Sequence, residues 1–115
     1  MDSILTSIKK LLGIDESYEH FDQDIIMHIN SIFFTLKQLG IGPVAGFTIS
    51  DKSALWKDFI EENKMESVRT YMFLKVRLLF DPPMSSAVME CINQNAKEIE
   101  WRLYAEAENE KTVNS

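Results

Sequence analysis

The chain has 115 residues, of which 45% are hydrophobic and 26% charged, and its formal net charge is −6. This length supports one hydrophobic core rather than two ordinary ones, and the composition is that of a soluble globular protein, which excludes disorder of the whole chain. The acidic balance argues against a protein that grips nucleic acid through its phosphates, and the single cysteine, Cys91, excludes an internal disulfide and a thiolate-rich metal site.

The first two predicted helices are amphipathic, and each ends at a glycine. The first has apolar side chains at helical spacing, with Asp2 as the expected N-cap and Gly13 in the left-handed position after the last turn. After a polar connection, Asp22 is expected to cap a second helix that runs to Gly40. The apolar positions of the second helix alternate four and three residues apart, at Ile25, Ile29, Ile32, Leu36 and Leu39.

The middle of the chain is predicted to form a loop followed by two further helices. Residues 41–50 contain two glycines and a proline, which favour a loop. A third helix is expected over residues 52–62, and Asn63 with Glu66 at capping-box spacing predicts the start of a fourth. Residues 64–80 also alternate as a one-faced strand would, but their length and the cap favour a helix. Because this segment is apolar on many sides, we expect it to be the buried centre of the bundle.

The last predicted helix follows a sharp turn. The Asp-Pro-Pro sequence at residues 81–83 ends the fourth helix, since proline lacks an N–H and fixes φ. The last helix is expected from Pro83 to about Glu106, followed by a polar tail over residues 109–115 that we expect to fray. One apolar stripe of this helix is expected to face inward, at Met84, Val88, Cys91, Ile92, Ile99 and Leu103. The predicted fold is all-α, a compact bundle of about five helices with one long loop, in a single domain over residues 1–108.

Few residues have the pattern of a chemical site. His20 and His28 are eight residues apart and do not share a helix face as an i,i+4 ligand pair would, so no metal site or cofactor is expected. Cys91 falls on an apolar stripe, which favours an inert core thiol over a nucleophile. The glycines between residues 40 and 46 lack the spacing and the following lysine of a phosphate-binding loop. The many carboxylates lack a pocket motif, so we do not expect an enzyme.

Five residues are candidates for a partner interface, namely Arg69, Arg77, Trp101, Arg102 and Tyr104. The first two lie on the predicted central helix among aromatic side chains, a mixture that would suit nucleic acid. The apolar density around them favours buried alkyl stems with charged tips at a subunit boundary. Trp101 beside Arg102 fits a partner anchor, since Trp and Arg are enriched at binding hot spots. A core position fits Trp101 equally well. Glu98 and Arg102 have the spacing of an exposed i,i+4 ion pair.

Four segments resemble a known family: Ser7–Asp15 (SIKKLLGID), Ile29–Pro43 (INSIFFTLKQLGIGP), Arg69–Ser86 (RTYMFLKVRLLFDPPMSS) and Glu100–Leu103 (EWRL). Together they resemble small proteins encoded in the head-gene cluster of tailed bacteriophages, which are similar to the head-to-tail connector, or adaptor, family. The resemblance extends roughly from Ile4 to Leu103. It rests on packing and turn residues rather than on a chemical signature.

The resemblance implies a structural virion protein. Connector subunits of this kind form a ring, commonly of twelve copies, beneath the portal; the ring extends the DNA channel and docks the next neck or tail component. The implied partners are further copies of the chain, the portal protein and a neck or tail-completion protein, while genome DNA passes through without specific binding. The terminal helix, with Trp101 and Arg102, and the polar tail are expected to contact the portal.

The implied location is the virion neck, after assembly in the host cytoplasm. No apolar run approaches the ~20 residues that a membrane span needs, and the short amphipathic N-terminal segment does not have the pattern of a signal peptide. Two alternatives remain open. One is a small phage-encoded DNA-binding regulator, which the helix count allows but the net charge and the lack of a basic recognition helix disfavour. The other is a different neck or tail-completion protein, which composition does not distinguish.

Overall fold

The computed structural model describes residues 3–114, with side chains described over residues 3–109. This part of the chain contains five helices: α1 (Ile4–Leu11), α2 (Asp22–Gln38), α3 (Trp56–Phe59), α4 (Glu62–Phe80) and α5 (Ser86–Asn114). It forms no strand, only an isolated bridge between Ser3 and Leu55. The all-α prediction is confirmed. Among the helices of this region, none combines the length and the hydropathy that crossing a bilayer requires.

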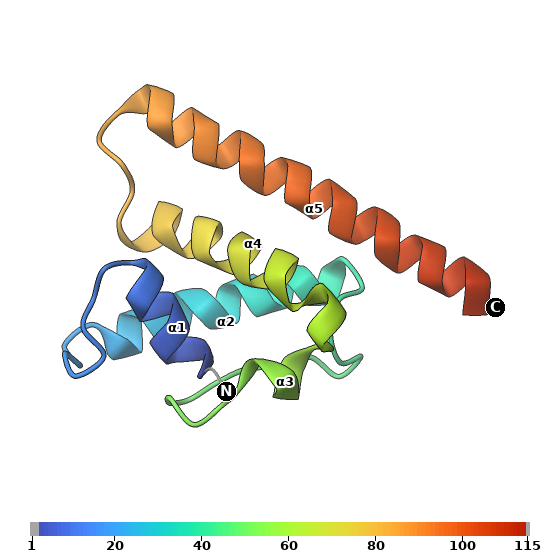
Figure 1. Ribbon diagram of the computed structural model, residues 1–115, viewed down its shortest axis with the longest axis horizontal. Coiled ribbons are helices and arrows are strands. Elements are labelled where there is room, and N and C mark those ends of the chain that lie inside the picture. Colours follow the sequence, from blue (N-terminus) through green and yellow to red (C-terminus); the bar gives the residue numbers. More distant parts are fainter. Residues whose placement is uncertain (1–2, 115) are drawn as a thin grey trace.

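Helix α4 lies at the centre of the fold and contacts each of the other four helices. Figure 1 shows α5 along one side of α4, and α1, α2 and α3 on the other. The side chains that α4 buries are Val68, Tyr71, Met72 and Val76. The predicted helix at the centre of the bundle is therefore confirmed, and the strand alternative for this segment is wrong.

Helix α1 is joined to the start of α2 by a buried lysine. Lys9 is only 2% exposed, and its ammonium group lies 2.8 Å from a carboxylate oxygen of Asp22. The ammonium also donates hydrogen bonds to the carbonyls of Glu16 (3.1 Å) and Tyr18 (2.7 Å). Asp22 is the first residue of α2 rather than its predicted cap, because its carboxylate is engaged by Lys9. These bonds hold the polar connection against the body of the protein.

The predicted cap of the first helix is corrected. Ser3 is the N-cap of α1, and its hydroxyl accepts a hydrogen bond from the backbone N–H of Thr6 at 3.2 Å. Asp2 lies outside the described residues. The predicted glycine after this helix is confirmed, since Gly13 has φ of +81°.

The third and fourth helices begin at different places from those predicted. Helix α3 has a single turn, because the backbone before it is extended and bonds to α1 through the Ile4 N–H and the Ala54 carbonyl at 3.0 Å. The predicted capping box at Asn63 is wrong, because α4 begins two residues earlier than predicted, at Glu62, and its N-cap, Glu61, makes no side-chain cap bond. Asp58 instead closes the turn of α3 by accepting a hydrogen bond from the Leu55 N–H at 3.0 Å.

Helix α5 is longer than predicted and begins later. Its first turn is capped by Ser85, whose hydroxyl accepts a hydrogen bond from the Val88 N–H at 3.3 Å. The helix continues to Asn114, so the tail expected to fray is helical as far as that residue. Its inner stripe consists of Ile92, Ala96, Ile99, Leu103 and Ala107. Three side chains that were predicted to face inward are exposed instead, namely Met84, Val88 and Cys91. Met84 precedes the helix, and Cys91 lies on the flank of this stripe.

Candidate subunit interface

The inner face of α5 is fixed to the body by one polar and several apolar contacts. The Tyr71 hydroxyl, on a fully buried side chain of α4, donates a hydrogen bond to a carboxylate oxygen of Glu100 at 2.7 Å. Burial and this neighbouring carboxylate raise the pKa of Tyr71. Further along, Ala107 packs on Gly40, where an added Cβ would lie 3.3 Å from the Ala107 methyl group. These contacts determine which face of α5 points outward.

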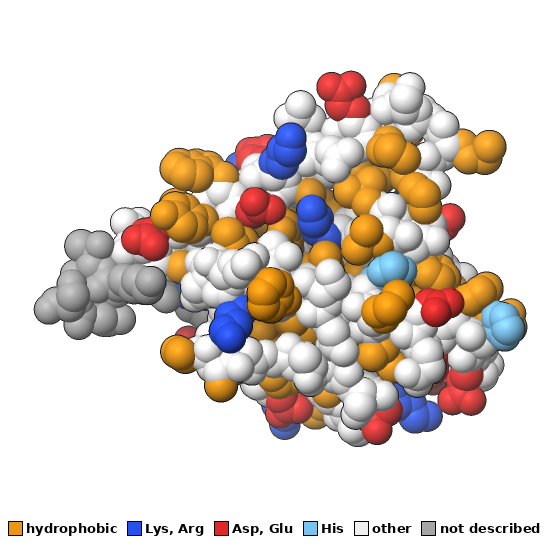
Figure 2. All heavy atoms as spheres, turned by 180° about the vertical axis from the view of Figure 1, so that it is seen from behind, with side chains coloured by type: hydrophobic (Ala, Val, Ile, Leu, Met, Phe, Trp, Pro, Cys, Tyr) orange, Lys and Arg blue, Asp and Glu red, His pale blue; other side chains and the backbone are white. Residues whose placement is uncertain are grey.

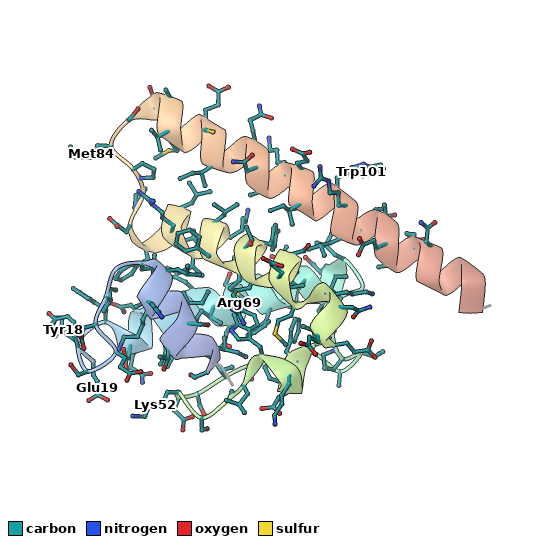
Figure 3. The ribbon with its side chains drawn as sticks, in the orientation of Figure 1. Tyr18, Glu19, Lys52, Arg69, Met84 and Trp101 are labelled. Atoms are coloured by element: carbon teal, nitrogen blue, oxygen red, sulfur yellow. The ribbon has the colours of Figure 1, made fainter. Side chains whose placement is uncertain are left out.

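The outward face carries an exposed aromatic pair. Trp101 is 66% exposed and Tyr104 is 43% exposed, and their rings stack with centroids 6.3 Å apart. Figure 3 shows Trp101 pointing away from the body of the protein. Beside it, Glu98 and Arg102 form the predicted exposed ion pair. The core position for Trp101 is thus wrong. Together Glu98, Trp101, Arg102 and Tyr104 form what we call the α5 outer face.

A small groove lies on a different surface, between α2 and the loop that follows it. We call this hollow of about 270 Å³ the α2 groove; it is lined by Asn30, Phe33, Phe34, Lys37, Ala45, Gly46, Phe47 and Thr48. Its loop wall is held by Asn30, whose amide nitrogen donates to the Ile49 carbonyl at 2.9 Å and whose amide oxygen accepts from the Ile49 N–H at 2.7 Å. The groove is therefore built into the fold.

Aromatic rings form the floor of the α2 groove. Phe33 packs against Phe47 and Phe59, with ring centroids 5.2 and 4.6 Å away. At the rim, Phe34 is 60% exposed, and the Lys37 stem passes over Gly46, where an added Cβ would lie 3.5 Å from the Lys37 Cδ. In the view opposite to Figure 1, hydrophobic side chains extend across the middle of this side while acidic ones lie mainly toward its edges (Figure 2).

The two surfaces differ in charge. Between Asp24 and Asp51 the chain carries no carboxylate, and Lys37 is its only Lys or Arg. Residues 98–109 of α5 carry four carboxylates and one guanidinium, a net charge of −3. The α2 groove thus has a cation at its rim, whereas the single carboxylate of the α5 outer face, Glu98, is paired with Arg102, and Lys97 precedes it.

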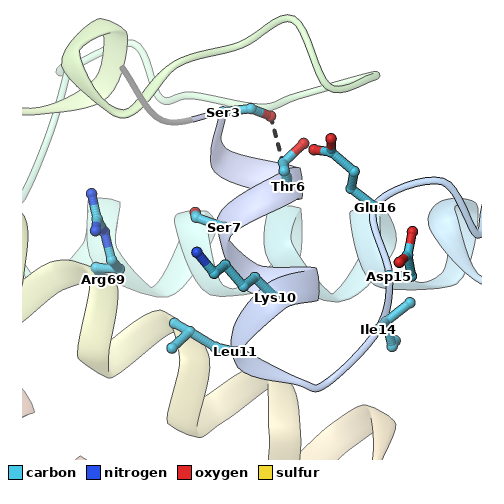
Figure 4. Close-up of a pocket in the computed structure, with 9 residues that line it drawn as sticks. All are labelled: Ser3, Thr6, Ser7, Lys10, Leu11, Ile14, Asp15, Glu16 and Arg69. Carbon is cyan, nitrogen blue, oxygen red and sulfur yellow. Dashed lines mark hydrogen bonds between the residues drawn. The ribbon is translucent and has the colours of Figure 1, made fainter.

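Arg69 lies elsewhere, at a cleft of about 820 Å³ between α1 and α4 (Figure 4). Its guanidinium lies 5.7 Å from the ring centroid of the buried Trp56. The other lining residues have both signs of charge, from Lys10 to Asp15 and Glu16. No cluster of His, Cys, Asp and Glu suited to a metal ion occurs among the residues that the structure describes. This mixed and open lining does not have the converging groups of a catalytic site.

The five predicted interface residues thus fall into three places. Trp101, Arg102 and Tyr104 lie together on the α5 outer face, and Arg69 lies at the α1 cleft. Arg77 is half-buried on α4, and within residues 3–109 its Nε has no hydrogen-bond partner. Sequence reasoning missed the α2 groove. The run without carboxylates between residues 24 and 51 is the signal that would have indicated it.

Comparison with known proteins gives one match. The family described as phage connector protein matches residues 4–110. No curated protein and no solved structure matches the chain.

Proposed function

The chain belongs to the phage connector protein family, and from this premise we propose that it is a head-to-tail connector subunit that forms a ring under the portal. The ring extends the DNA channel and docks the next neck or tail component. The observation that carries the proposal is the family match, which covers nearly the whole of the helical fold.

The charge of the chain suits a channel for DNA. With a net charge of −6, the ring would not hold the phosphates of a genome that must pass through it. The cationic residues of α4 support the same reading. Arg69, Lys75 and Arg77 are all half-buried in the body of the subunit rather than displayed in an open basic stripe.

We assign the contact with the portal to the last turns of α5. Figure 1 shows this end of the helix extending past the rest of the fold. Ala107 is the last buried residue of the inner stripe within residues 3–109, and the proposed axial contact is made by the helix beyond Asn109. Lateral contacts between copies then involve the sides of the subunit, and a ring requires two different surfaces for them.

The first test is electron microscopy of a lysate from the encoding phage with this gene disrupted. We expect DNA-filled or leaking heads to accumulate apart from finished tails. Normal joined particles would refute the connector function. Supplying the intact gene from a plasmid should restore joined particles and controls for effects on neighbouring genes.

A second test addresses the portal contact. A chain truncated after Asn109 keeps Ala107 and should remain folded but lose binding to the portal protein in a pull-down assay. A chain truncated after Tyr104 is the poorer reagent, because it also removes the packing of Ala107 on Gly40. Undiminished portal binding by the folded Asn109 truncation would show that this end of α5 is not the contact.

A further inference from the structure

We propose that the end of the molecule where α2 begins and α4 ends binds an arginine-bearing segment of a partner protein. A row of exposed and half-buried rings, bordered by carboxylates, forms this surface, which we call the aromatic end. Its rings belong to Tyr18, His20, Phe21, His28 and Phe80. Because each subunit carries this surface by itself, the binding does not depend on the proposed ring.

The rings of the aromatic end pack against one another across three parts of the chain. Phe21 is the N-cap of α2, and its ring centroid lies 5.8 Å from that of Tyr18 and 5.4 Å from that of Phe80, the last residue of α4. The His20 ring lies edge-on to Phe21 at 4.9 Å, and the His28 ring lies edge-on to Phe80 at 6.4 Å. Tyr18 is 50% exposed and Phe21 36% exposed, so the row is open to solvent.

A buried ion pair holds the aromatic end in shape. The Lys9 ammonium group donates a hydrogen bond to the Tyr18 carbonyl at 2.7 Å and lies 2.8 Å from the carboxylate of Asp22, the residue after Phe21. Because Lys9 is buried, its charge is compensated inside the fold rather than displayed at the surface. A surface that is ordered before binding loses less conformational entropy when a partner docks.

Unpaired carboxylates border the rings. Glu19 stands between two of the rings in the sequence, Asp24 lies one helical turn before His28, and Asp81 directly follows the last ring of α4; all three carboxylates are exposed. Within residues 3–109 none of the three has an ion-pair partner. Figure 2 shows an acidic side chain between the two histidines, which are pale blue, and Figure 3 shows Glu19 beside Tyr18 at the edge of the molecule.

The segments that form the aromatic end contain no cation of their own. Residues 11–36 and 78–96 have neither Lys nor Arg. Of the cations that flank these two ranges, Lys10 lines the α1 cleft and Lys37 lines the α2 groove. Lys97 lies about three turns into α5, and Arg77 is half-buried on α4. The negative charge at this end is therefore left for a partner to compensate.

The rings and the carboxylates together fit a guanidinium group. Its flat face stacks on aromatic rings within about 6 Å of the ring centroid, and its five N–H groups donate in a fork to carboxylates. The carboxylates would repel nucleic acid, and a purely apolar segment would bury them without a partner, which is costly. An arginine side chain satisfies both the rings and the charges.

Titration of the full-length, ¹⁵N-labelled protein with a tetra-arginine peptide, followed by NMR at pH 8, tests the site. Ordinary histidines are neutral at this pH. The largest shifts should occur at the amides of residues 17–28 and 79–82. Replacing the three carboxylates together, as Glu19→Gln, Asp24→Asn and Asp81→Asn, should weaken binding roughly tenfold through the loss of three exposed ion pairs.

The matched control removes the same charge from exposed positions at the start of α4 and near the end of α5, as Glu62→Gln, Glu66→Gln and Glu106→Gln. It should change the affinity for tetra-arginine by less than about twofold, because salt screens charges that lie far from the bound peptide. Equal weakening by the two triple variants would overturn the site, since it would indicate general attraction to an acidic protein.

A tetra-lysine peptide of equal charge separates recognition of guanidinium from attraction of any cation. It should bind roughly threefold or more weakly than tetra-arginine, and Tyr18→Leu should weaken only the arginine peptide. Equal binding of the two peptides, or shifts spread over the whole surface, would overturn the proposal. Shifts at this end that depend on protein concentration alone would also overturn it, because a second copy would then be the occupant. None of these results bears on the connector function, which disruption of the gene tests separately.

Discussion

The hydrogen bond between Tyr71 and Glu100 gives the sharpest test of how α5 is held to the body. Replacing Tyr71→Phe removes the hydroxyl that donates to the carboxylate at 2.7 Å and leaves the ring in place. A hydrogen bond to a charged group contributes about 1.5–3 kcal/mol. Because Glu100 is half-buried and regains water when its donor is lost, we expect the lower end, a fall of roughly 1.5 kcal/mol in the free energy of unfolding at pH 7.

This difference should depend on pH. In the folded protein the pKa of Tyr71 is raised above its unfolded value of about 10. The contribution of Tyr71 to the free energy of unfolding is therefore complete below pH 10. Above pH 10 the tyrosine ionises in the unfolded chain but not in the folded protein, so this contribution falls by about 1.4 kcal/mol per pH unit. The wild type and the Tyr71→Phe variant should thus be about equally stable near pH 11.

Urea unfolding followed by circular dichroism between pH 7 and pH 11 measures both quantities. The control is Tyr104→Phe, which removes a hydroxyl from an exposed tyrosine on α5 and should change stability by less than about 0.5 kcal/mol at each pH. A Tyr71→Phe effect below about 0.5 kcal/mol at pH 7, or one that is the same at pH 8 and pH 11, would refute this account of the contact.

Three further substitutions test the packing by the same unfolding measurement. Leu103→Ala removes a side chain that is 1% exposed and should cost about 2–5 kcal/mol; a cost below 1 kcal/mol would mean that α5 is not packed as described. Lys9→Met leaves the Asp22 carboxylate without its cation and should cost roughly 3–5 kcal/mol, whereas an unchanged midpoint would contradict the buried pair. Gly42→Ala should also destabilise, because φ is +89° and the added Cβ would overlap the Phe59 ring; an equally stable variant would exclude this close approach.

Much of the fold was predictable because its signals are local. Apolar spacing indicated α1, α2 and α4, and glycines after the first two helices have the positive φ expected of them. The apolar sides of α4 predicted a central helix, since a helix can bury several faces only when other elements surround it. Helix starts were predicted less well. Asn63 and Asp22 are suitable caps by residue type, but α4 begins at Glu62 without a side-chain cap, and the Asp22 carboxylate pairs with Lys9.

The candidate site was predictable only in part. Residue type indicated Trp101 as an interface residue, but its spacing along the helix fits a core position and a surface position equally. Only the position of α4 shows which face of α5 is covered. Cys91 was misplaced for the same reason, because a shift of one residue turns a side chain by about 100° around the helix.

The sequence alone therefore determined the helical class, the order of the elements and the acidic character of the chain, because these depend on residues close together or on composition. The tertiary structure decided the burial of Lys9, the exposure of Trp101 and the existence of the α2 groove. The groove depends on Asn30 reaching Ile49, nineteen residues along the chain. Contacts of this kind leave no periodic pattern, because they form only when separate elements pack together.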